Sequence, residues 1–256
     1  MADETTKKRL IQRRSDFQHV EIYQHPHYGR QLVLDGDLQI STCDIAYQVS
    51  LTTPLLGQLP PKAKVAILGG GDGGVLNQLL YHHDEGHINI ARALLIDIDA
   101  TVVDLCQQYM PVLNNRIFNH PVAEIVIGDA FAFLASHSDH FDAIIYDLTM
   151  TPIHANESQE AFSQHTLSLI TNALKPSGVL TMQVCGLKET ERTLIRQANF
   201  LQDFIPHLCR DLFEHVEQQR VHIPSFEMKW LFQSAVCPYK QSAQQKHLPQ
   251  KVMRRA

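Results

Sequence analysis

A glycine-rich segment with one embedded carboxylate, Gly-Gly-Gly-Asp-Gly-Gly at residues 69–74, is the part of this chain best suited to binding a ligand. It follows a short apolar run and precedes a helical pattern, which is the strand, turn and helix start where α/β proteins bind nucleotides. Glycine allows the sharp turn and a close approach of the backbone to a ligand. Asp72 is unusual there, because a carboxylate opposes the binding of phosphate. The loop therefore favours a cationic ligand without phosphate, such as a nucleoside sulfonium that bears an amine.

Three further carboxylates, Asp97, Asp129 and Asp147, each follow a later apolar strand pattern. In a doubly wound sheet, ligands bind outside the carboxyl ends of the strands, so we expect these side chains and Asp72 to face one crevice. For Asp129, and for Asp99 beside Asp97, helix N-capping is an open alternative.

The spacing of these acids indicates different roles. Asp97 lies 20 to 30 residues beyond the glycine loop, as do the acids that accept ribose hydroxyls in nucleoside sites. Asp129, in a Gly-Asp-Ala turn, is suited to accept a hydrogen bond from an exocyclic amino group such as adenine N6. Asp72 and Asp147 are left beside the reacting end, where they would pair with amines.

Strand and helix patterns alternate from residue 62 onward. Apolar runs predict strands at 65–68, 93–96, 124–127, 143–146 and 178–184, and amphipathic patterns predict helices at 75–82, 100–109, 130–136, 160–174 and 189–204. Continuous apolar strands between amphipathic helices indicate a parallel sheet covered on both faces. Runs at 216–222 and 228–235 predict a closing antiparallel pair. The predicted fold class is α/β, a Rossmann-like (methyltransferase-type) doubly wound sheet.

A small antiparallel β-unit is predicted before this sheet. Residues 19–23, 31–34 and 38–40 alternate with period two, and Asp35-Gly36 between two of these runs is a hairpin signal. Residues 1–15 are polar and mixed in charge, and we expect a short helix or a loose arm there. A helix is predicted at 44–56. The domain boundaries follow as 1–57 for the N-terminal unit, 58–240 for the sheet domain and 241–256 for a polar, basic, mobile tail.

Composition restricts the class of protein. The 256 residues are 44% hydrophobic and 19% charged with a net charge of −5, which predicts one substantial globular domain and opposes nucleic-acid binding. We expect no membrane partner and no secretory leader, because the apolar runs are short. The five cysteines are dispersed, which predicts free thiols in a reducing compartment, the cytoplasm. The histidine cluster His82, His83 and His87 lacks a ligand pattern, so we expect a solvated helix end and no metal site.

Several of these motifs together resemble one family. The hairpin sequence at 28–39, the loop at 68–74, Asp97-Ile-Asp99, Gly128-Asp129-Ala130 and the strand end at Asp147 are similar to the polyamine aminopropyltransferases, the spermidine and spermine synthases. The similarity covers residues 15 to 235. It implies an oligomerising N-terminal β-unit, with a homodimer or homotetramer, ahead of a Rossmann-like catalytic domain. It also implies transfer of an aminopropyl group from decarboxylated S-adenosylmethionine, as co-substrate, to a polyamine amine, with methylthioadenosine released and no other cofactor.

The resemblance also assigns roles to single residues. It implies that Asp72 binds the aminopropyl amine and that Asp147 and Tyr47 are the catalytic pair flanking the attacking nitrogen. Gln39 and Glu227 would lie near the acceptor. The nucleoside contacts would come from Gln18, Gly69, Gly70, Gly71, Asp97, Asp129 and Ala130.

The sequence departs from the spermidine synthase pattern at the acceptor side. Val49 replaces an acid, and the second acid expected after Asp147 is missing. The segments 147–153 and 224–230 are closer to spermine synthases, although Glu227 is displaced by one position and Lys229 adds a positive charge. Spermidine and spermine synthesis both stay open. An S-adenosylmethionine-dependent methyltransferase and a non-catalytic polyamine-binding homologue are the alternatives.

The proposed chemistry needs carboxylates. An alkyl amine with a pKa near 10.4 must lose a proton before it attacks carbon, which costs about 4 kcal/mol at pH 7. Asp147, with Tyr47 or a water, is suited to accept that proton. Asp72 would attract the ammonium of the decarboxylated donor and repel the carboxylate of ordinary S-adenosylmethionine, by about 1–4 kcal/mol for charges ~4 Å apart.

Overall fold

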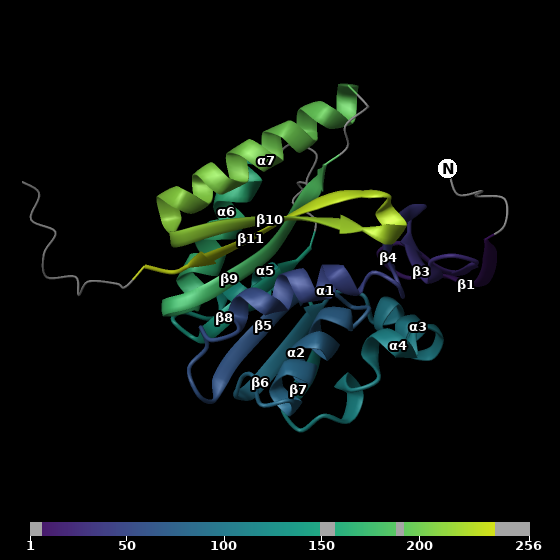
Figure 1. Cartoon of the computed structure of the whole chain (residues 1–256), viewed down its shortest axis with the longest axis horizontal. Coiled ribbons are helices and arrows are strands. Elements are labelled where there is room, and N and C mark those ends of the chain that lie inside the picture. Colours follow the sequence, from purple (N-terminus) through teal and green to yellow (C-terminus); the bar gives the residue numbers. More distant parts are fainter. Residues whose placement is uncertain (1–6, 149–156, 188–191, 239–256) are drawn as a thin grey trace, which may run out of the picture.

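Two sheets organise the chain (Figure 1), and the computed structural model describes residues 7–148, 157–187 and 192–238. The N-terminal sheet is antiparallel, in the order β1(Lys8–Arg14), β2(His19–His25), β3(Gly29–Leu34) and β4(Asp37–Ser41). The predicted hairpin is confirmed: Asp35 and Gly36 join β3 to β4 with φ of 48° and 87°.

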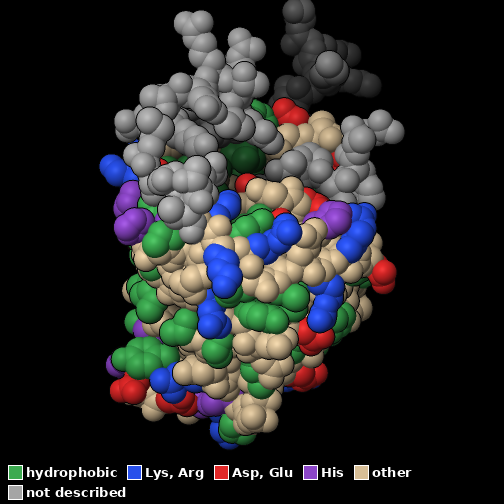
Figure 2. Space-filling model, turned by 90° about the vertical axis from the view of Figure 1, so that its right-hand side faces the viewer, with side chains coloured by type: hydrophobic (Ala, Val, Ile, Leu, Met, Phe, Trp, Pro, Cys, Tyr) green, Lys and Arg blue, Asp and Glu red, His purple; other side chains and the backbone are tan. Residues whose placement is uncertain are grey.

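Strand β1 corrects the expectation of a short helix or a loose arm for residues 8–14, whereas residues 1–6 lie outside the described part of the chain. It pairs antiparallel with β2 and forms the edge of the sheet. Only Leu10 and Ile11 in its centre are partly buried, so the apolar alternation that marks a strand is too short to read from the sequence. Its charged side chains are typical of an edge strand. Figure 2 shows Lys and Arg side chains dispersed among apolar ones on the side of the molecule that carries this sheet.

The large sheet has seven strands in the order β10-β11-β9-β8-β5-β6-β7. Strands β5 to β9 are mutually parallel, and β10 and β11 form the predicted antiparallel closing pair. Their bounds are β5(Ala63–Gly69), β6(Ile90–Asp97), β7(Ala123–Ile127), β8(Phe141–Asp147), β9(Leu174–Leu187), β10(Glu214–Ile223) and β11(Met228–Val236). The two neighbours of β5 are β6 and β8, so the strand order reverses at β5, and such a switch point opens a crevice at the carboxyl ends.

Helices cover both faces of this sheet, as predicted. They are α1(Ile45–Thr52), α2(Gly74–Asp84), α3(Ala100–Tyr109), α4(Pro111–Asn114), α5(Ala130–Ala135), α6(Gln159–Ala173) and α7(Arg192–Leu212), with short 3₁₀ turns η2(Thr53–Leu55), η3(Ile117–Asn119) and η4(Pro224–Phe226). Helix α7 ends eight residues beyond the predicted 204, and α4 is too short to give a periodic signal.

Successive side chains of each parallel strand point to opposite faces of the sheet and so contribute to two separate hydrophobic cores. In β5, Val65 and Ile67 pack with α1 to α4, whereas Ala66 and Leu68 pack with α5 to α7. Both sets are fully buried, which explains why the strands read as continuous apolar runs.

The N-terminal sheet shares the first of these cores. Val20, Ile22, Leu32 and Ile40 belong to the cluster that contains the residues of α2 and α3. Helix α1, which the predicted boundary at residue 57 assigns to the N-terminal unit, packs against α2 and β10. The small sheet is therefore fixed against the face that carries the crevice.

The predicted solvated helix end is confirmed for His87, which is exposed, and in part for His83, which is half-buried, but not for His82. His82 is buried, with its Nδ1 3.4 Å from Nδ1 of His87, because helix α2 turns that face inward. Within the described residues, no group of three or more His, Cys, Asp or Glu side chains is arranged to hold a metal ion. Among the same residues, no helix combines the length and the apolar character needed to cross a bilayer.

Candidate active site

The glycine loop places the Asp72 carboxylate at the N-terminus of α2. Its Oδ1 accepts the Gly74 N–H at 2.8 Å, and its backbone oxygen accepts Asn114 Nδ2 at 3.0 Å. Free N–H groups and the helix dipole favour an anion at this position, which is where a phosphate binds in nucleotide sites. The chain fills that position with its own carboxylate, so the loop presents negative charge to a ligand.

Asp97, at the end of β6, is held by the backbone on both of its oxygens. Gly71 N–H donates to Oδ2 at 2.8 Å and Asp99 N–H donates to Oδ1 at 2.9 Å. A Cβ on Gly71 would lie 2.7 Å from Asp97 Oδ2, so glycine is required for this approach. Each carboxylate oxygen keeps a further lone pair for a ligand hydroxyl.

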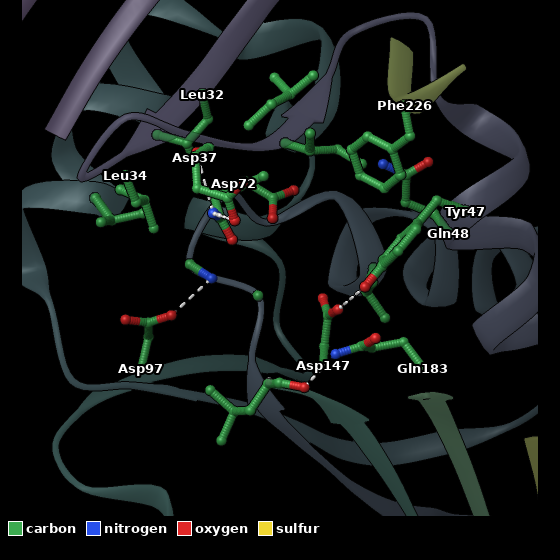
Figure 3. Close-up of a pocket in the computed structure, with 18 of the residues that line it drawn as sticks. Leu32, Leu34, Asp37, Tyr47, Gln48, Asp72, Asp97, Asp147, Gln183 and Phe226 are labelled. Atoms are coloured by element: carbon green, nitrogen blue, oxygen red, sulfur yellow. Dashed lines mark hydrogen bonds between the residues drawn. The ribbon is translucent and has the colours of Figure 1, made fainter. Parts of the chain in front are cut away.

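Asp147, at the end of β8, is hydrogen-bonded to Tyr47 on α1. The Tyr47 hydroxyl donates to Oδ1 at 2.7 Å (Figure 3). Asp44 fixes the start of α1, since its oxygens accept Ser41 N–H at 2.7 Å and Ser225 N–H at 3.0 Å. These hydrogen bonds of Asp44 connect β4, α1 and η4, and they fix the start of the helix that places the Tyr47 hydroxyl beside Asp147.

These carboxylates line one cavity of about 380 Å³ between the two sheets. Figure 3 shows Asp97 and Asp147 on either side of the loop that carries Asp72. Of the predicted site residues, the cavity brings together Gln18, Gln39, Tyr47, Gly70, Gly71, Asp72, Asp97 and Asp147. Apolar walls come from both units, including Leu32, Leu34, Phe226 and Trp230.

A second cavity of about 420 Å³ adjoins the first. Asp97, Ile98 and Leu148 line both, and the second also contains Asp129 and Ala130. Asp129 caps α5, with its Oδ1 accepting Phe131 N–H at 2.8 Å, and Asp99 caps α3. The capping alternative therefore holds for both residues. Asp129 nevertheless lines the cavity and is exposed, so capping leaves its second oxygen for a ligand.

Two predicted site residues line neither of the two cavities. Gly69 packs beneath the loop, where an added Cβ would meet Leu148 Cδ2 at 2.5 Å. Glu227 lies on the exposed corner between β10 and β11, and its Oε1 accepts the Tyr28 hydroxyl at 2.8 Å. Segments 149–156 and 239–256 are outside the described residues, so the run after Asp147 and the basic tail have no structural account.

Several residues that line the first cavity were not identified as site residues from the sequence, among them Asp37, Gln48, Gln183 and Trp230. Asp37 lies two residues from Gln39 on β4, and this period-two spacing was a usable signal. Gln183, near the carboxyl end of β9, accepts Trp230 Nε1–H at 3.0 Å and donates to the backbone oxygen of Leu148. Gln48 follows Tyr47 on α1 and lines the first cavity. For Gln48 and Trp230, no local pattern distinguishes a lining residue from a core residue.

Burial shifts the protonation of the carboxylates. It raises the pKa of Asp72 to about 6, opposed by the hydrogen bond from Gly74 and helped by the charge of Asp97. Burial, and then the charge of Asp72, holds the pKa of Asp147 well above its usual range. Like charges in a poorly solvated cavity raise the free-energy cost of ionising all of these carboxyl groups, and a cationic ligand would lower that cost.

Replacing Gly70 by alanine is expected to lower kcat by at least about tenfold. A Cβ there would lie 2.7 Å from Asp147 Oδ2 and would push the carboxylate off its Tyr47 partner. Gly86→Ala is the matched control, because Gly86 has a similar φ of +75° with nothing within 4 Å. Steady-state kinetics should show the loss in the Gly70 variant alone, and equal losses in both would assign the effect to backbone strain.

Comparison with known proteins agrees with this geometry. A family model described as the spermine/spermidine synthase domain matches residues 45–246, and one described as the spermidine synthase tetramerisation domain matches residues 5–42. The polyamine aminopropyltransferase of Aeropyrum pernix is 31% identical over 226 residues, which are 87% of this chain and 67% of that protein. The spermidine synthase of Schizosaccharomyces pombe is 35% identical over 178 residues, 69% of this chain and 57% of that protein.

Solved structures show the same fold. The crystal structure of spermidine synthase from Thermotoga maritima aligns with a TM-score of 0.71 at 24% identity, over 90% of this chain and 72% of that one. The chain thus spans between about half and three quarters of the length of these relatives.

Proposed function

Because this chain belongs to the spermine/spermidine synthase family, we propose that it transfers an aminopropyl group from decarboxylated S-adenosylmethionine to a polyamine amine and releases methylthioadenosine. The observation that carries the proposal is the set of carboxylates Asp72, Asp97 and Asp147 around one glycine loop, where the phosphate position is already filled. A cationic nucleoside without phosphate matches that charge distribution.

The two adjoining cavities fit the two parts of such a donor. Adenine would occupy the second cavity beside Asp129 and Ala130, and the ribose hydroxyls would bond to Asp97, which lines both cavities. The aminopropyl arm would then extend into the first cavity, with its ammonium at Asp72. Burial and the charge of Asp97 raise the pKa of Asp72 because they destabilise its ionised form, and an ammonium bound there would offset that destabilisation.

The transfer step is a displacement at carbon. The acceptor nitrogen forms a bond to the carbon next to sulfur while the C–S bond breaks, and its electron pair goes to sulfur, which leaves as a neutral thioether. The ammonium proton of the acceptor first passes to Asp147, and Tyr47 holds that carboxylate in place. The raised pKa of Asp147 brings it closer to that of an amine, which reduces the cost of the proton transfer.

A product assay tests the function directly. The protein is incubated with decarboxylated S-adenosylmethionine and, in parallel, putrescine, cadaverine, agmatine or spermidine, and methylthioadenosine is quantified. Release that depends on an acceptor supports the proposal. Methyl transfer from S-adenosylmethionine without any thioadenosine would support a methyltransferase, and binding without turnover would support a non-catalytic homologue.

The second ammonium of the acceptor is assigned to Asp37. This carboxylate lines the same cavity as Asp147 from the opposite sheet, and its Oδ2 accepts only a 3.3 Å hydrogen bond from Gln39 among the contacts of the described residues. It would take the role of the acid that the family resemblance implies shortly after Asp147 and that the sequence lacks.

Asp37→Asn is accordingly expected to raise the KM of the acceptor by about tenfold, with little change in the KM of the donor. Glu227→Gln serves as the comparison, because Glu227 lies on the exposed corner and bonds to Tyr28. Steady-state kinetics with saturating donor measures both. If Glu227→Gln raises the KM of the acceptor more than Asp37→Asn does, Glu227 binds the acceptor, as the family resemblance implies, and Asp37 does not.

The proposal includes an oligomeric state and a cellular compartment for the protein. The match of residues 5–42 to a tetramerisation domain supports a homodimer or homotetramer formed through the N-terminal sheet. None of the five cysteines, all of which lie within the described residues, forms a disulfide bond, which fits a reducing compartment such as the cytoplasm.

A further inference from the structure

Asp99 makes more contacts than a helix cap requires. It is 2% exposed, and its Oδ1 accepts Thr101 N–H at 3.0 Å, which satisfies the cap of α3. Its backbone N–H meanwhile donates to Asp97 Oδ1 at 2.9 Å. Capping requires only one side-chain oxygen, which a serine or threonine could supply. The second oxygen of the Asp99 carboxylate is therefore available for another contact.

That second oxygen reaches across to the N-terminal unit. Asp99 Oδ2 accepts the Ser15 hydroxyl at 2.7 Å and Gln18 Nε2 at 3.0 Å. Ser15 Oγ also accepts the backbone N–H groups of Phe17 and Gln18, each at 3.1 Å, which closes the turn before β2. Asp99 therefore fixes both the backbone turn and the side chain of Gln18.

The contact determines which end of the Gln18 amide faces the cavity. An ionised carboxylate only accepts hydrogen bonds, so the amide must turn its Nε2 toward Asp99. Its carbonyl oxygen is then left for a ligand in the cavity that Gln18 lines together with Asp97. The two vicinal hydroxyls of a ribose are hydrogen-bond donors, and this arrangement offers one acceptor on each unit.

We infer that Asp99 is a positioning residue for the donor: it orients the Gln18 amide so that its carbonyl oxygen accepts a ribose hydroxyl alongside Asp97. This inference rests on the proposed function, because it requires a ribonucleoside in the cavity. Both units then contribute to the donor site, because Ser15 and Gln18 precede β2 in the N-terminal unit and Asp99 precedes α3 in the sheet domain.

The test is equilibrium binding of methylthioadenosine and of its 2′-deoxy and 3′-deoxy analogues, by calorimetry. Wild-type protein should bind at least one deoxy analogue about tenfold more weakly than methylthioadenosine. In Asp99→Asn, which keeps the α3 cap, methylthioadenosine should bind about tenfold more weakly and the penalty for that deoxy analogue should nearly vanish. Gln18→Ala should behave in the same way, and adding Asp99→Asn to it should have no further effect.

A paired substitution separates orientation from a merely structural role. In Asp99→Asn/Gln18→Glu, the carboxylate introduced at position 18 accepts from the amide introduced at position 99 and still presents an oxygen to the ribose, so both the affinity and the deoxy penalty should return. Asp104→Asn, at an exposed position of α3, is the matched control and should change neither. Thermal melts of every variant check folding.

The outcomes separate the role of Asp99 from the proposed function. Failure of the wild-type protein to bind methylthioadenosine would overturn the proposed function together with this inference. Binding with an unchanged deoxy penalty in Asp99→Asn, or multiplicative losses in the Gln18→Ala/Asp99→Asn combination, would overturn the role of Asp99 alone.

Discussion

Replacing Asp147 by asparagine is expected to slow product formation by about a thousandfold, within the range of 10² to 10⁴ for the loss of a general base. Asparagine is nearly isosteric and can still accept the 2.7 Å hydrogen bond from Tyr47, but it cannot take a proton from the acceptor ammonium. The measurement is single-turnover release of methylthioadenosine with saturating donor and acceptor.

The residual activity of this variant should depend on pH in a characteristic way. Without a proton acceptor, the reaction relies on acceptor that is already deprotonated, so the rate should rise about tenfold per pH unit between pH 7 and 9. Tyr47→Phe is the companion variant, and we expect a smaller loss because the carboxylate remains. Binding of methylthioadenosine should stay within about twofold of wild type in both. An unchanged rate in Asp147→Asn would mean that Asp147 does not accept the proton.

Asp72→Asn is expected to remove donor selectivity. Asparagine keeps the hydrogen bond from Gly74 but loses the attraction to the aminopropyl ammonium, so the affinity for decarboxylated S-adenosylmethionine should fall by about a hundredfold. The affinity for S-adenosylmethionine should not fall, because its carboxylate is no longer repelled. Calorimetric titration with both donors gives the ratio. In Asp129→Asn, at the adenine end, both affinities should change together and the ratio should stay constant, so an unchanged ratio in Asp72→Asn would contradict the assignment.

The raised pKa of Asp72 adds a pH dependence to this prediction. In wild-type protein, donor affinity should decline as the pH falls below about 6, because protonated Asp72 no longer attracts a cation, and the variant should lack this decline. The sign for folding is opposite. A carboxyl whose pKa is raised on folding destabilises the native state increasingly from its usual pKa up to about 6 and fully above it.

Ligand-free Asp72→Asn should therefore be more stable than wild type at pH 7.5, by on the order of 3 kcal/mol, and nearly equally stable at pH 4. Denaturant unfolding at the two pH values measures this. A variant that is less stable at pH 7.5 would show that the carboxylate is a net stabilising cap of α2 and not a strained binding group.

Local patterns were sufficient for most of the fold. The parallel strands, the helices between them and the Asp35-Gly36 hairpin follow from side-chain periodicity and turn chemistry, which act within a few residues. The same rules located Asp72, Asp97 and Asp147, because topology places the carboxyl ends of parallel strands at one edge. Strand β1 was missed for the converse reason, since an edge strand with two half-buried side chains carries almost no periodicity.

Tertiary structure alone decided how those carboxylates are held and what surrounds them. The contacts of Asp44 with Ser225 and of Asp99 with Ser15 join residues 181 and 84 positions apart, and no local pattern encodes such pairs. Packing of the small sheet brings Asp37 and Gln18 to the cavity and leaves Glu227 on an exposed corner. The sequence by itself thus located the glycine loop and its internal acid and predicted the class of ligand they favour, because strand ends and turns are local. The packing of the N-terminal unit against the sheet domain decided which further residues line the site. That packing is set by the hydrophobic core that the two units share.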